Sequence, residues 1–186
     1  MPRNKREQDR EEKRGEIIAA ARRLFLSDGF EASAISRLAQ AAGVTPNTIY
    51  WYFKDKDDVL VAVLEAELAA QLAEYQSLPF AGLAERLLWV VNRLEQVSQL
   101  VSTVHARLHA SAAVNDWHDR FHMLTEGLLS AEMQNAGGAA DRIPALVKIS
   151  VFTIEGLLAH SLSQEEKQNI CAALVGALLS RNSALP

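Results

Sequence analysis

Residues 35–56 read ISRLAQAAGVTPNTIYWYFKDK, and this stretch decides the fold of the chain. Its pattern predicts a short helix, a tight turn at Gly43, and a second short helix with polar and aromatic side chains on its outer face. Ala39 is small enough to let the two helices cross closely, and Val44 and Ile49 would pack inside the unit. This layout is typical of a helix-turn-helix, which places its second helix in the major groove of DNA.

Local signals on either side of the turn predict where the helices begin and end. Apolar residues recur at helical spacing from about Glu11 and stop at Asp28–Gly29, where a glycine can end a helix. Ser33 is predicted to cap the next helix. Thr45 is predicted to cap the one after it, with Pro46 at its first position.

The rest of the chain also reads as helix. Asp55, with Asp58 three residues later, predicts the start of a long helix over 56–76. Ser163 and Glu166 form a similar capping pattern further on. Beyond Pro79, periodicity predicts helices over 82–102, 103–113, 115–135, 143–162 and 164–181. We therefore predict an all-α protein with a mobile arm (1–10), a helix-turn-helix domain (11–55) and a helical domain for ligand binding and dimerisation (56–186).

Composition limits the class of protein. The 186 residues are 49% hydrophobic and 23% charged, which fits a globular chain that can bury a core. The single cysteine, Cys171, excludes an intramolecular disulfide and a cysteine-based metal cage, and its helical surroundings predict a buried, inert thiol. No signal peptide or apolar stretch of roughly 20 residues is present. We expect a cytoplasmic protein without a membrane partner.

Charge is distributed unevenly along the chain. The net charge is −4, but residues 1–60 carry 11 Lys and Arg against 10 Asp and Glu, whereas the remainder carries 8 against 13. The first 14 residues alone hold six basic and four acidic side chains. The asymmetry has the direction expected of a nucleic-acid binder, although it is small.

The second helix of the turn carries side chains suited to reading DNA. Asn47 can pair with adenine, and threonine can offer a methyl group to thymine or a hydroxyl to phosphate. Tyrosine hydroxyls and Lys56 suit phosphate contacts. The four aromatics at 50–53 could instead be core, but four consecutive residues cannot all face inward on one helix. We expect Phe53 and part of Trp51 to be buried.

The wider stretch over residues 29–60, GFEASAISRLAQAAGVTPNTIYWYFKDKDDVL, resembles the N-terminal domain of the tetracycline-repressor (TetR) family, and the resemblance covers about 14–64. It implies a homodimeric, all-helical transcriptional regulator that pairs through its last two long helices and holds a small ligand in each C-terminal domain. The family commonly has histidine where this chain has Tyr52. Carried over by position, the resemblance implies that the DNA contacts are Ser33, Ser36, Arg37, Thr45, Pro46, Asn47, Thr48, Tyr50, Trp51, Tyr52 and Lys56.

The C-terminal helices offer weaker signals for a ligand site. Small-molecule pockets combine apolar walls with a few polar groups. Polar and aromatic residues within the apolar helical faces are therefore candidates, although each is also explained as an ordinary core aromatic or a surface histidine. The candidates are Trp89, Asn92, His105, His109, Trp117, Phe121, His122, Phe152 and Glu155.

Two histidine pairs suggest an alternative function. His105 and His109 stand four residues apart, as do His118 and His122, and such a pair on a helix can chelate a transition metal. The spacing also arises by chance, and neither pair carries the glutamate of a metalloprotease motif. A metal-binding bundle or enzyme is thus the alternative, and a helical adaptor that binds only protein is a third hypothesis.

The leading prediction is a sequence-specific DNA-binding regulator, most simply a repressor that a small molecule releases from a palindromic operator. Such release requires an inducer that binds better to a conformation whose recognition helices no longer match the two half-sites. We expect no enzyme activity, no metal, and no cofactor other than an inducer of unknown identity. The sequence leaves open the inducer, the operator and the sign of regulation.

Overall fold

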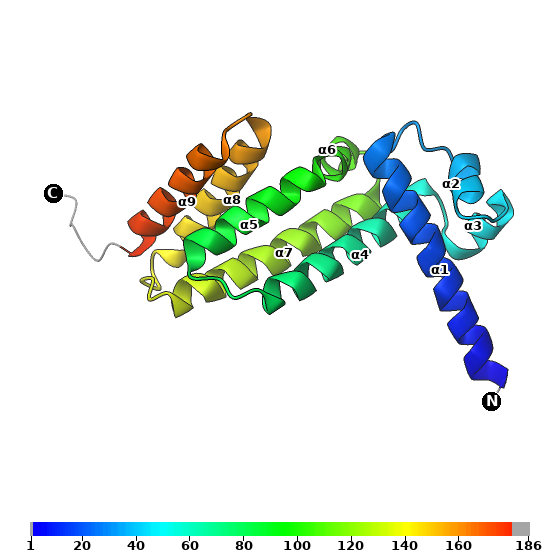
Figure 1. Cartoon of the computed structure of the whole chain (residues 1–186), viewed down its shortest axis with the longest axis horizontal. Helices are drawn as coiled ribbons and strands as arrows, with labels where there is room; N and C mark the ends of the chain where they lie inside the picture. The colour runs from blue at the N-terminus through cyan, green and yellow to red at the C-terminus, as the bar shows by residue number, and fades with distance from the viewer. Residues whose placement is uncertain (1, 180–186) are drawn as a thin grey trace. The chain divides into compact units, whose positions relative to one another are not determined.

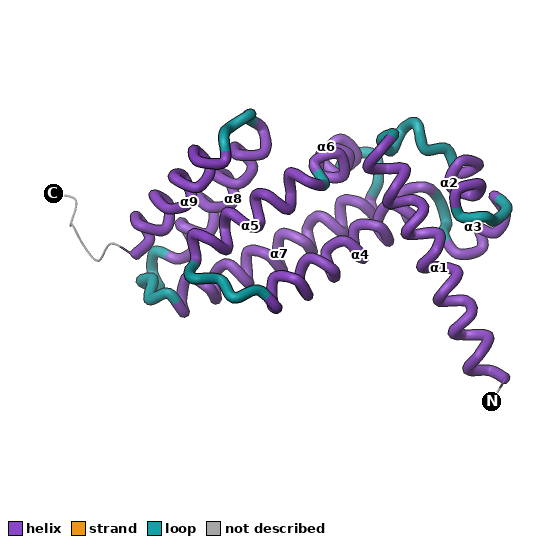
Figure 2. The backbone as a smooth tube through the Cα atoms, viewed as in Figure 1, coloured by secondary structure: helices purple, strands orange, loops and turns teal. Residues whose placement is uncertain are grey.

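The computed structural model describes the backbone of residues 2–179 and the side chains of residues 7–177. Within that range all regular structure is helical, as predicted, and loops join the helices (Figure 2). The helices are α1 (Pro2–Ser27), α2 (Ile35–Ala41), α3 (Pro46–Tyr52), α4 (Lys56–Ser77), α5 (Leu83–Gln96), α6 (Ser98–Arg107), α7 (Ala112–Asn135), α8 (Ile143–Ala159) and α9 (Gln164–Leu179).

The chain divides into two compact units, and they do not follow the predicted boundary at residue 55. The first comprises the residues up to Ser77 together with Gln99–His118, and the second comprises Leu78–Ser98 and the residues from Asp119 onward. Helix α4 thus belongs with α1, α2 and α3, and α7 contributes to both units. The functional roles assigned to the predicted domains stay a prediction.

In the first unit, α1 packs against α2 and α4, and α2 packs against α3 (Figure 1). Ile17 and Phe25 of α1, Leu38 of α2, Ile49 of α3 and Leu60 of α4 have no more than 1% of their surface exposed. Ile17, Ala21 and Phe25 stand four positions apart along α1, so they form one buried stripe on that helix. The core that the four helices share fixes how α3 is presented.

Helix α1 begins well before the predicted start near Glu11. It includes residues 2–10, which the sequence had suggested as a mobile arm. This segment has no apolar stripe to reveal a helix, but its glutamates, lysines and arginines are good helix formers. Propensity, rather than hydrophobic periodicity, therefore extends α1 toward the N-terminus.

In the second unit, α5 packs against both α8 and α9, which lie beside each other (Figure 1). Its core is formed by Leu87 and Val91 of α5, Met133 of α7, Val147 of α8 and Cys171 of α9, together with their apolar neighbours. Cys171 is 2% exposed, and burial raises the pKa of its thiol, as expected of an inert buried cysteine.

Candidate nucleic-acid interface

The turn between α2 and α3 has the geometry that the sequence predicts. Gly43 adopts a φ of 65°, in the left-handed region that glycine enters without steric cost. The backbone N–H of Val44 donates to the carbonyl of Ala39 across 2.9 Å, which closes the turn. Ala39 itself is 1% exposed, which agrees with its predicted place where α2 and α3 pack together.

Helix α3 starts as predicted. Thr45 is its N-cap, and its hydroxyl oxygen accepts a hydrogen bond of 3.3 Å from the backbone N–H of Thr48. The two threonine hydroxyls lie 2.9 Å apart and bond to each other. Pro46 occupies the first turn, where its missing N–H costs nothing. The cap fixes the direction in which this short helix leaves the turn.

The aromatic run of α3 is divided between core and surface. Ile49 and Phe53 are buried, with 0% and 2% of their surface exposed, whereas Tyr50 and Trp51 are 55% and 63% exposed. Thr45, Pro46 and Asn47 are also exposed, and Thr48 and Tyr52 are partly buried. Phe53 is therefore core, as expected, but Trp51 lies mostly outside it. The exposed face of α3 is therefore accessible to the major groove of DNA.

Ser33 is a correction. It was predicted to cap α2 and, by the family resemblance, to contact DNA, but it is 0% exposed. Its hydroxyl donates to the carbonyl of Gly29 across 2.7 Å, and the N-cap position of α2 is Ala34, which makes no side-chain cap. A buried hydroxyl that stabilises the loop before α2 cannot contact DNA in this conformation.

The two other predicted contacts around α2 are exposed. Ser36 is on the surface, and Arg37 is about half exposed. Arg37 donates to Asp28 across 2.5 Å and to the carbonyl of Ala32 across 3.2 Å. Hydrogen bonds from the Ser27 hydroxyl and the Arg37 guanidinium lower the pKa of the Asp28 carboxyl. Arg37 therefore ties α2 to the end of α1, and a DNA contact there stays a prediction.

Lys56 stabilises the loop before α2. Its Nζ donates to the carbonyl of Phe30 across 2.9 Å and lies 4.0 Å from the centroid of the Phe30 ring. Arg107 of α6 stacks on the same ring at 4.8 Å and also binds Asp57, with hydrogen bonds of 2.5 and 2.8 Å. These cations hold the loop and the start of α4 together. The predicted phosphate contact of Lys56 is untested.

Sequence reasoning missed two residues beside α3. Arg10 of α1 lies with its Cζ 4.6 Å from the centroid of the Trp51 ring, and Arg14 lies 5.3 Å from that of Phe53. The i, i+4 spacing of the two arginines was visible in the sequence. The predicted arm over residues 1–10, however, places Arg10 outside the folded domain.

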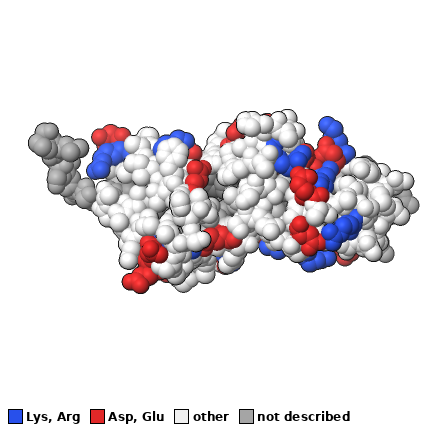
Figure 3. All heavy atoms as spheres, turned by 90° about the horizontal axis from the view of Figure 1, so that it is seen from above, with Lys and Arg blue, Asp and Glu red and all other residues white. Residues whose placement is uncertain are grey.

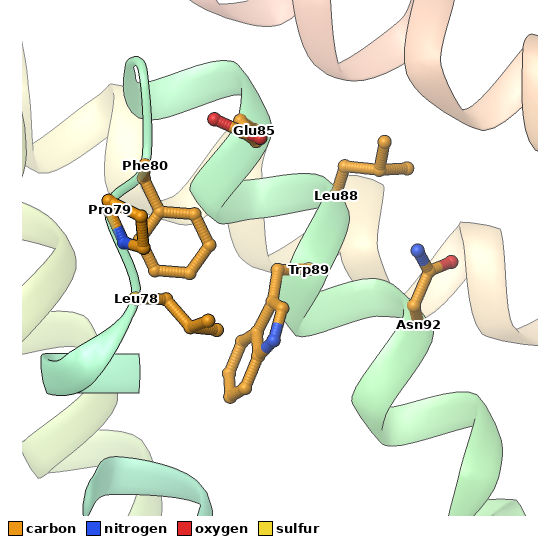
Figure 4. A pocket seen from close by; sticks show the side chains of 7 residues that line it. All are labelled: Leu78, Pro79, Phe80, Glu85, Leu88, Trp89 and Asn92. Carbon is orange, nitrogen blue, oxygen red and sulfur yellow. The ribbon is translucent and has the colours of Figure 1, made fainter. Parts of the chain in front are cut away.

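A second candidate site is a pocket of about 330 Å³ in the second unit (Figure 4). The loop before α5 contributes Leu78, Pro79 and Phe80, and α5 contributes Glu85, Leu88, Trp89 and Asn92. The rings of Phe80 and Trp89 meet edge to face with centroids 6.0 Å apart. The wall is mostly apolar, with a carboxylate and an amide.

Only two of the predicted ligand residues, Trp89 and Asn92, line this pocket. The others are placed elsewhere. Trp117 is buried, Phe121 and His122 are partly buried with ring centroids 5.6 Å apart, and the rest are exposed. The exposed ones are His105, His109, Phe152 and Glu155. The residues of the loop before α5 were missed, because a proline-containing loop gives no periodic signal.

The predicted histidine pairs do not belong to a larger cluster of ligand side chains in the described part of the chain. His105 meets His118 edge to face at 5.6 Å between centroids. Among the described residues there is no group of three or more His, Cys, Asp or Glu side chains that could hold a metal ion. The same part of the chain contains no helix that is both long and apolar enough to cross a membrane. The metal-binding alternative therefore gains no support from the geometry.

The fold and the exposed face of α3 define a helix-turn-helix DNA-binding protein, and comparison with known proteins narrows the class. The family model for "Bacterial regulatory proteins, tetR family" matches residues 17–63. The HTH-type transcriptional regulator AcrR of Shigella flexneri is 41% identical over 61 residues, which is 33% of this chain and 28% of that protein. The match to that protein thus covers only a third of this chain.

Longer matches cover most of the chain. The HTH-type transcriptional repressor AcnR of Corynebacterium diphtheriae is 28% identical over 170 residues, or 85% of each chain. The crystal structure of a transcriptional regulator from Rhodococcus sp. Rha1 superposes with a TM-score of 0.72 at 17% identity, covering 93% of this chain and 99% of that one. The match of residues 17–63 and these longer similarities support a TetR-family transcriptional regulator. The chain is a DNA-binding regulator of transcription.

Proposed function

We propose that this chain represses transcription by binding a palindromic operator as a homodimer, and that a small molecule bound in its second unit releases it. The observation that carries the DNA-binding half is the partition of α3. Its buried residue Ile49 anchors the helix while Tyr50 and Trp51 stay exposed. Major-groove recognition requires a helix that packs against the core on one side and exposes side chains on the other.

Each exposed residue has a role that its chemistry supports. Asn47 would read adenine through its amide, and the threonine methyl groups would meet thymine. Tyr50, Tyr52 and Lys56 would contact phosphates, which set the register of the helix in the groove. Ser36 and Arg37 would contact the backbone from α2. The cytoplasm, where the operator DNA is accessible, is the compartment that we propose.

A gel-shift titration of the DNA upstream of the protein's own coding region tests this function. Asn47→Ala with Tyr50→Ala should weaken binding at least tenfold, because each good base contact contributes about 1–3 kcal/mol. Gln134→Ala, an exposed polar residue of α7, should bind like the wild type. Salt-insensitive binding, or a double variant as active as the wild type, would contradict the proposal.

The dimer would form through α8 and α9. Ile149 and Phe152 are one turn apart on α8 and are 49% and 67% exposed, which is unusual for large apolar side chains in a cluster. The exposed side of α9 carries small residues, including Ala172 and Gly176. Large apolar side chains on α8 could pack against the small residues of α9 in a partner subunit, as in a two-fold symmetric helix interface.

The pocket beside α5 is the proposed inducer site. Its volume of about 330 Å³ lies at the lower end of the range for small-molecule sites. Phe80 and Trp89 would hold a planar apolar group, and the Asn92 amide would supply a polar contact. Glu85 accepts a 2.6 Å hydrogen bond from the N–H of Ala81, so one carboxylate oxygen already stabilises the loop. We expect a small ligand with a flat apolar body.

A thermal-shift screen of planar aromatic compounds tests this assignment. A compound that raises the Tm of the wild type should lose its effect on Trp89→Ala and keep it on His109→Ala, which changes an exposed residue outside the pocket. The same compound should weaken operator binding. A hit that stabilises Trp89→Ala as well as the wild type would place the inducer elsewhere.

A further inference from the structure

Basic residues gather on one side of α1 between Arg10 and Arg14. Arg10, Lys13 and Arg14 are spaced three or four residues apart and share one side of the helix. That side continues into the buried residues Ile17 and Ala21, so it faces the folded unit. The exposed acidic residues of this stretch are not confined to one side: Glu12 lies opposite Arg10, Glu7 lies one turn before Arg10 on the same side, and Glu16 pairs with Lys13. The segment is thus a helix with a basic face, although its net charge is small.

Two of the three basic residues are placed against α3 and its end. The Arg10 guanidinium lies over the exposed Trp51 ring, and the Arg14 guanidinium lies over Phe53. Lys13 instead pairs with Glu16. Among the side chains that the structure describes, no carboxylate pairs with either arginine. Stacking occupies the flat face of a guanidinium and leaves its N–H edge free to donate.

These arginines add two cations to those of the helix-turn-helix, from a segment that precedes it in the chain. The family match begins at Ile17, so both residues precede it. On the face drawn in Figure 3, basic and acidic side chains are interspersed rather than gathered in one basic surface. The overall charge of −4 likewise gives no general attraction to DNA. Phosphate binding therefore needs cations placed locally beside α3.

We propose that Arg10 and Arg14 bind the DNA phosphate backbone next to the groove that α3 enters, with Trp51 and Phe53 as the platforms that orient them. The proposal rests on the DNA-binding function argued above. Arginine suits this role because its planar fork donates two parallel hydrogen bonds to phosphate oxygens. The contacts would be independent of base sequence, so they would strengthen binding to any duplex.

The test compares the full-length protein with Arg10→Gln/Arg14→Gln on two probes, a 30-bp random duplex and the DNA upstream of its own coding region. The dissociation constant is measured between 50 and 200 mM KCl. Each lost phosphate contact should reduce the slope of log K against log salt by about 0.9, so the double variant should lose about two. Affinity at 100 mM salt should fall on the order of tenfold, by the same factor on both probes.

Two further variants make the result decisive. Arg23→Gln removes one charge from an exposed position on the other side of α1 and should leave the slope unchanged. Arg10→Lys/Arg14→Lys should keep most of the slope, because the charge remains. A lysine variant whose slope falls as far as that of the glutamine variant would show that the charges at these positions do not contact phosphate, and would overturn the proposal.

The outcome also separates this inference from the proposed function. If Arg10→Gln/Arg14→Gln binds with an unchanged slope while Asn47→Ala/Tyr50→Ala loses the upstream DNA, the arginine proposal is wrong and the regulator stands. If the wild type binds neither probe, both are wrong. Far-UV circular dichroism reports whether each variant is folded. The single variant Arg10→Gln, at an exposed position, should reduce the salt slope by half as much as the double variant does.

Discussion

At the scale of single residues, the turn between α2 and α3 depends on the backbone of Gly43. A Cβ atom added there would meet nothing within 4 Å, so no steric contact selects glycine. The positive φ of 65° selects it instead, because a side chain in the left-handed region clashes with its own carbonyl group. The presentation of Tyr50 and Trp51 therefore depends on a residue that contacts neither.

Gly43→Ala should lower the free energy of unfolding by about 1 kcal/mol, through backbone strain alone. Gly43→Asn should cost less, because asparagine tolerates the left-handed region. Urea denaturation of both variants measures the difference. Equal losses for alanine and asparagine would point to a cause other than the backbone conformation.

Residue-level predictions from sequence succeeded where chain-local physics decides the outcome. Gly43, the Thr45 cap and buried Phe53 follow from turn chemistry and helical periodicity. Ser33 failed because serine can cap a helix or bond a preceding carbonyl, and the fold determines which. Here the carbonyl of Gly29 lies 2.7 Å from the Ser33 hydroxyl and accepts its hydrogen bond. That position results from three-dimensional packing rather than from spacing.

At the scale of helices, caps fix where several elements begin. Asp55 accepts a 2.9 Å hydrogen bond from the N–H of Asp58, and Asp58 accepts one of 3.0 Å from the N–H of Lys54. At α9 the Ser163 hydroxyl accepts from the N–H of Glu166, whose carboxylate accepts from the N–H of Ser163. Both were visible in sequence, because a capping pattern spans only four residues.

The cap of α9 should respond to pH. Hydrogen bonds from the backbone N–H and the hydroxyl of Ser163 lower the pKa of Glu166 from its ordinary 4.5. A lowered carboxyl pKa stabilises the fold above the unfolded value, and this stabilisation is lost as pH falls through the folded value. Wild type should therefore exceed Glu166→Gln in stability at pH 7, and the difference should shrink as the pH falls below 4.5.

Thermal melts at several pH values measure this difference. Glu165→Gln is the matched control, because Glu165 lies in the same first turn of α9 without accepting the capping bonds. Glu165→Gln should show the same loss of charge near the helix dipole as Glu166→Gln, but it should not lose the capping hydrogen bonds. A Glu166→Gln curve that runs parallel to the wild type at every pH would show that the capping carboxylate contributes nothing that depends on its charge.

At the scale of the whole chain, the sequence predicted helix order well and the ligand site poorly. Helices observed over Ala112–Asn135 and Ile143–Ala159 lie close to the predicted 115–135 and 143–162. The pocket was missed in part because its wall combines a loop with a helix face, and only packing brings them together. Apolar side chains alone do not reveal whether they face a core, a cavity or a partner.

The proposed dimer can be tested at Gly176 without disturbing the protomer. This glycine lies inside α9, is exposed, and has open space where a Cβ would stand, so no contact among the described residues requires it. Gly176→Leu should raise helix propensity by roughly 1 kcal/mol and stabilise an isolated protomer. If a partner helix packs closely there, the larger side chain should prevent dimerisation. Sedimentation velocity and a thermal melt report the two effects separately.

Phe152→Glu provides an independent disruption from α8, where this side chain is 67% exposed. It should convert the dimer to a monomer, because burying an unpaired carboxylate in an apolar interface is unfavourable. Met123→Glu on α7, which is 75% exposed, is the matched control and should stay dimeric. Monomeric variants should bind an operator much more weakly, because a single recognition helix meets one half-site only. A Gly176→Leu dimer that binds DNA like the wild type would exclude α9 as a close-packed interface.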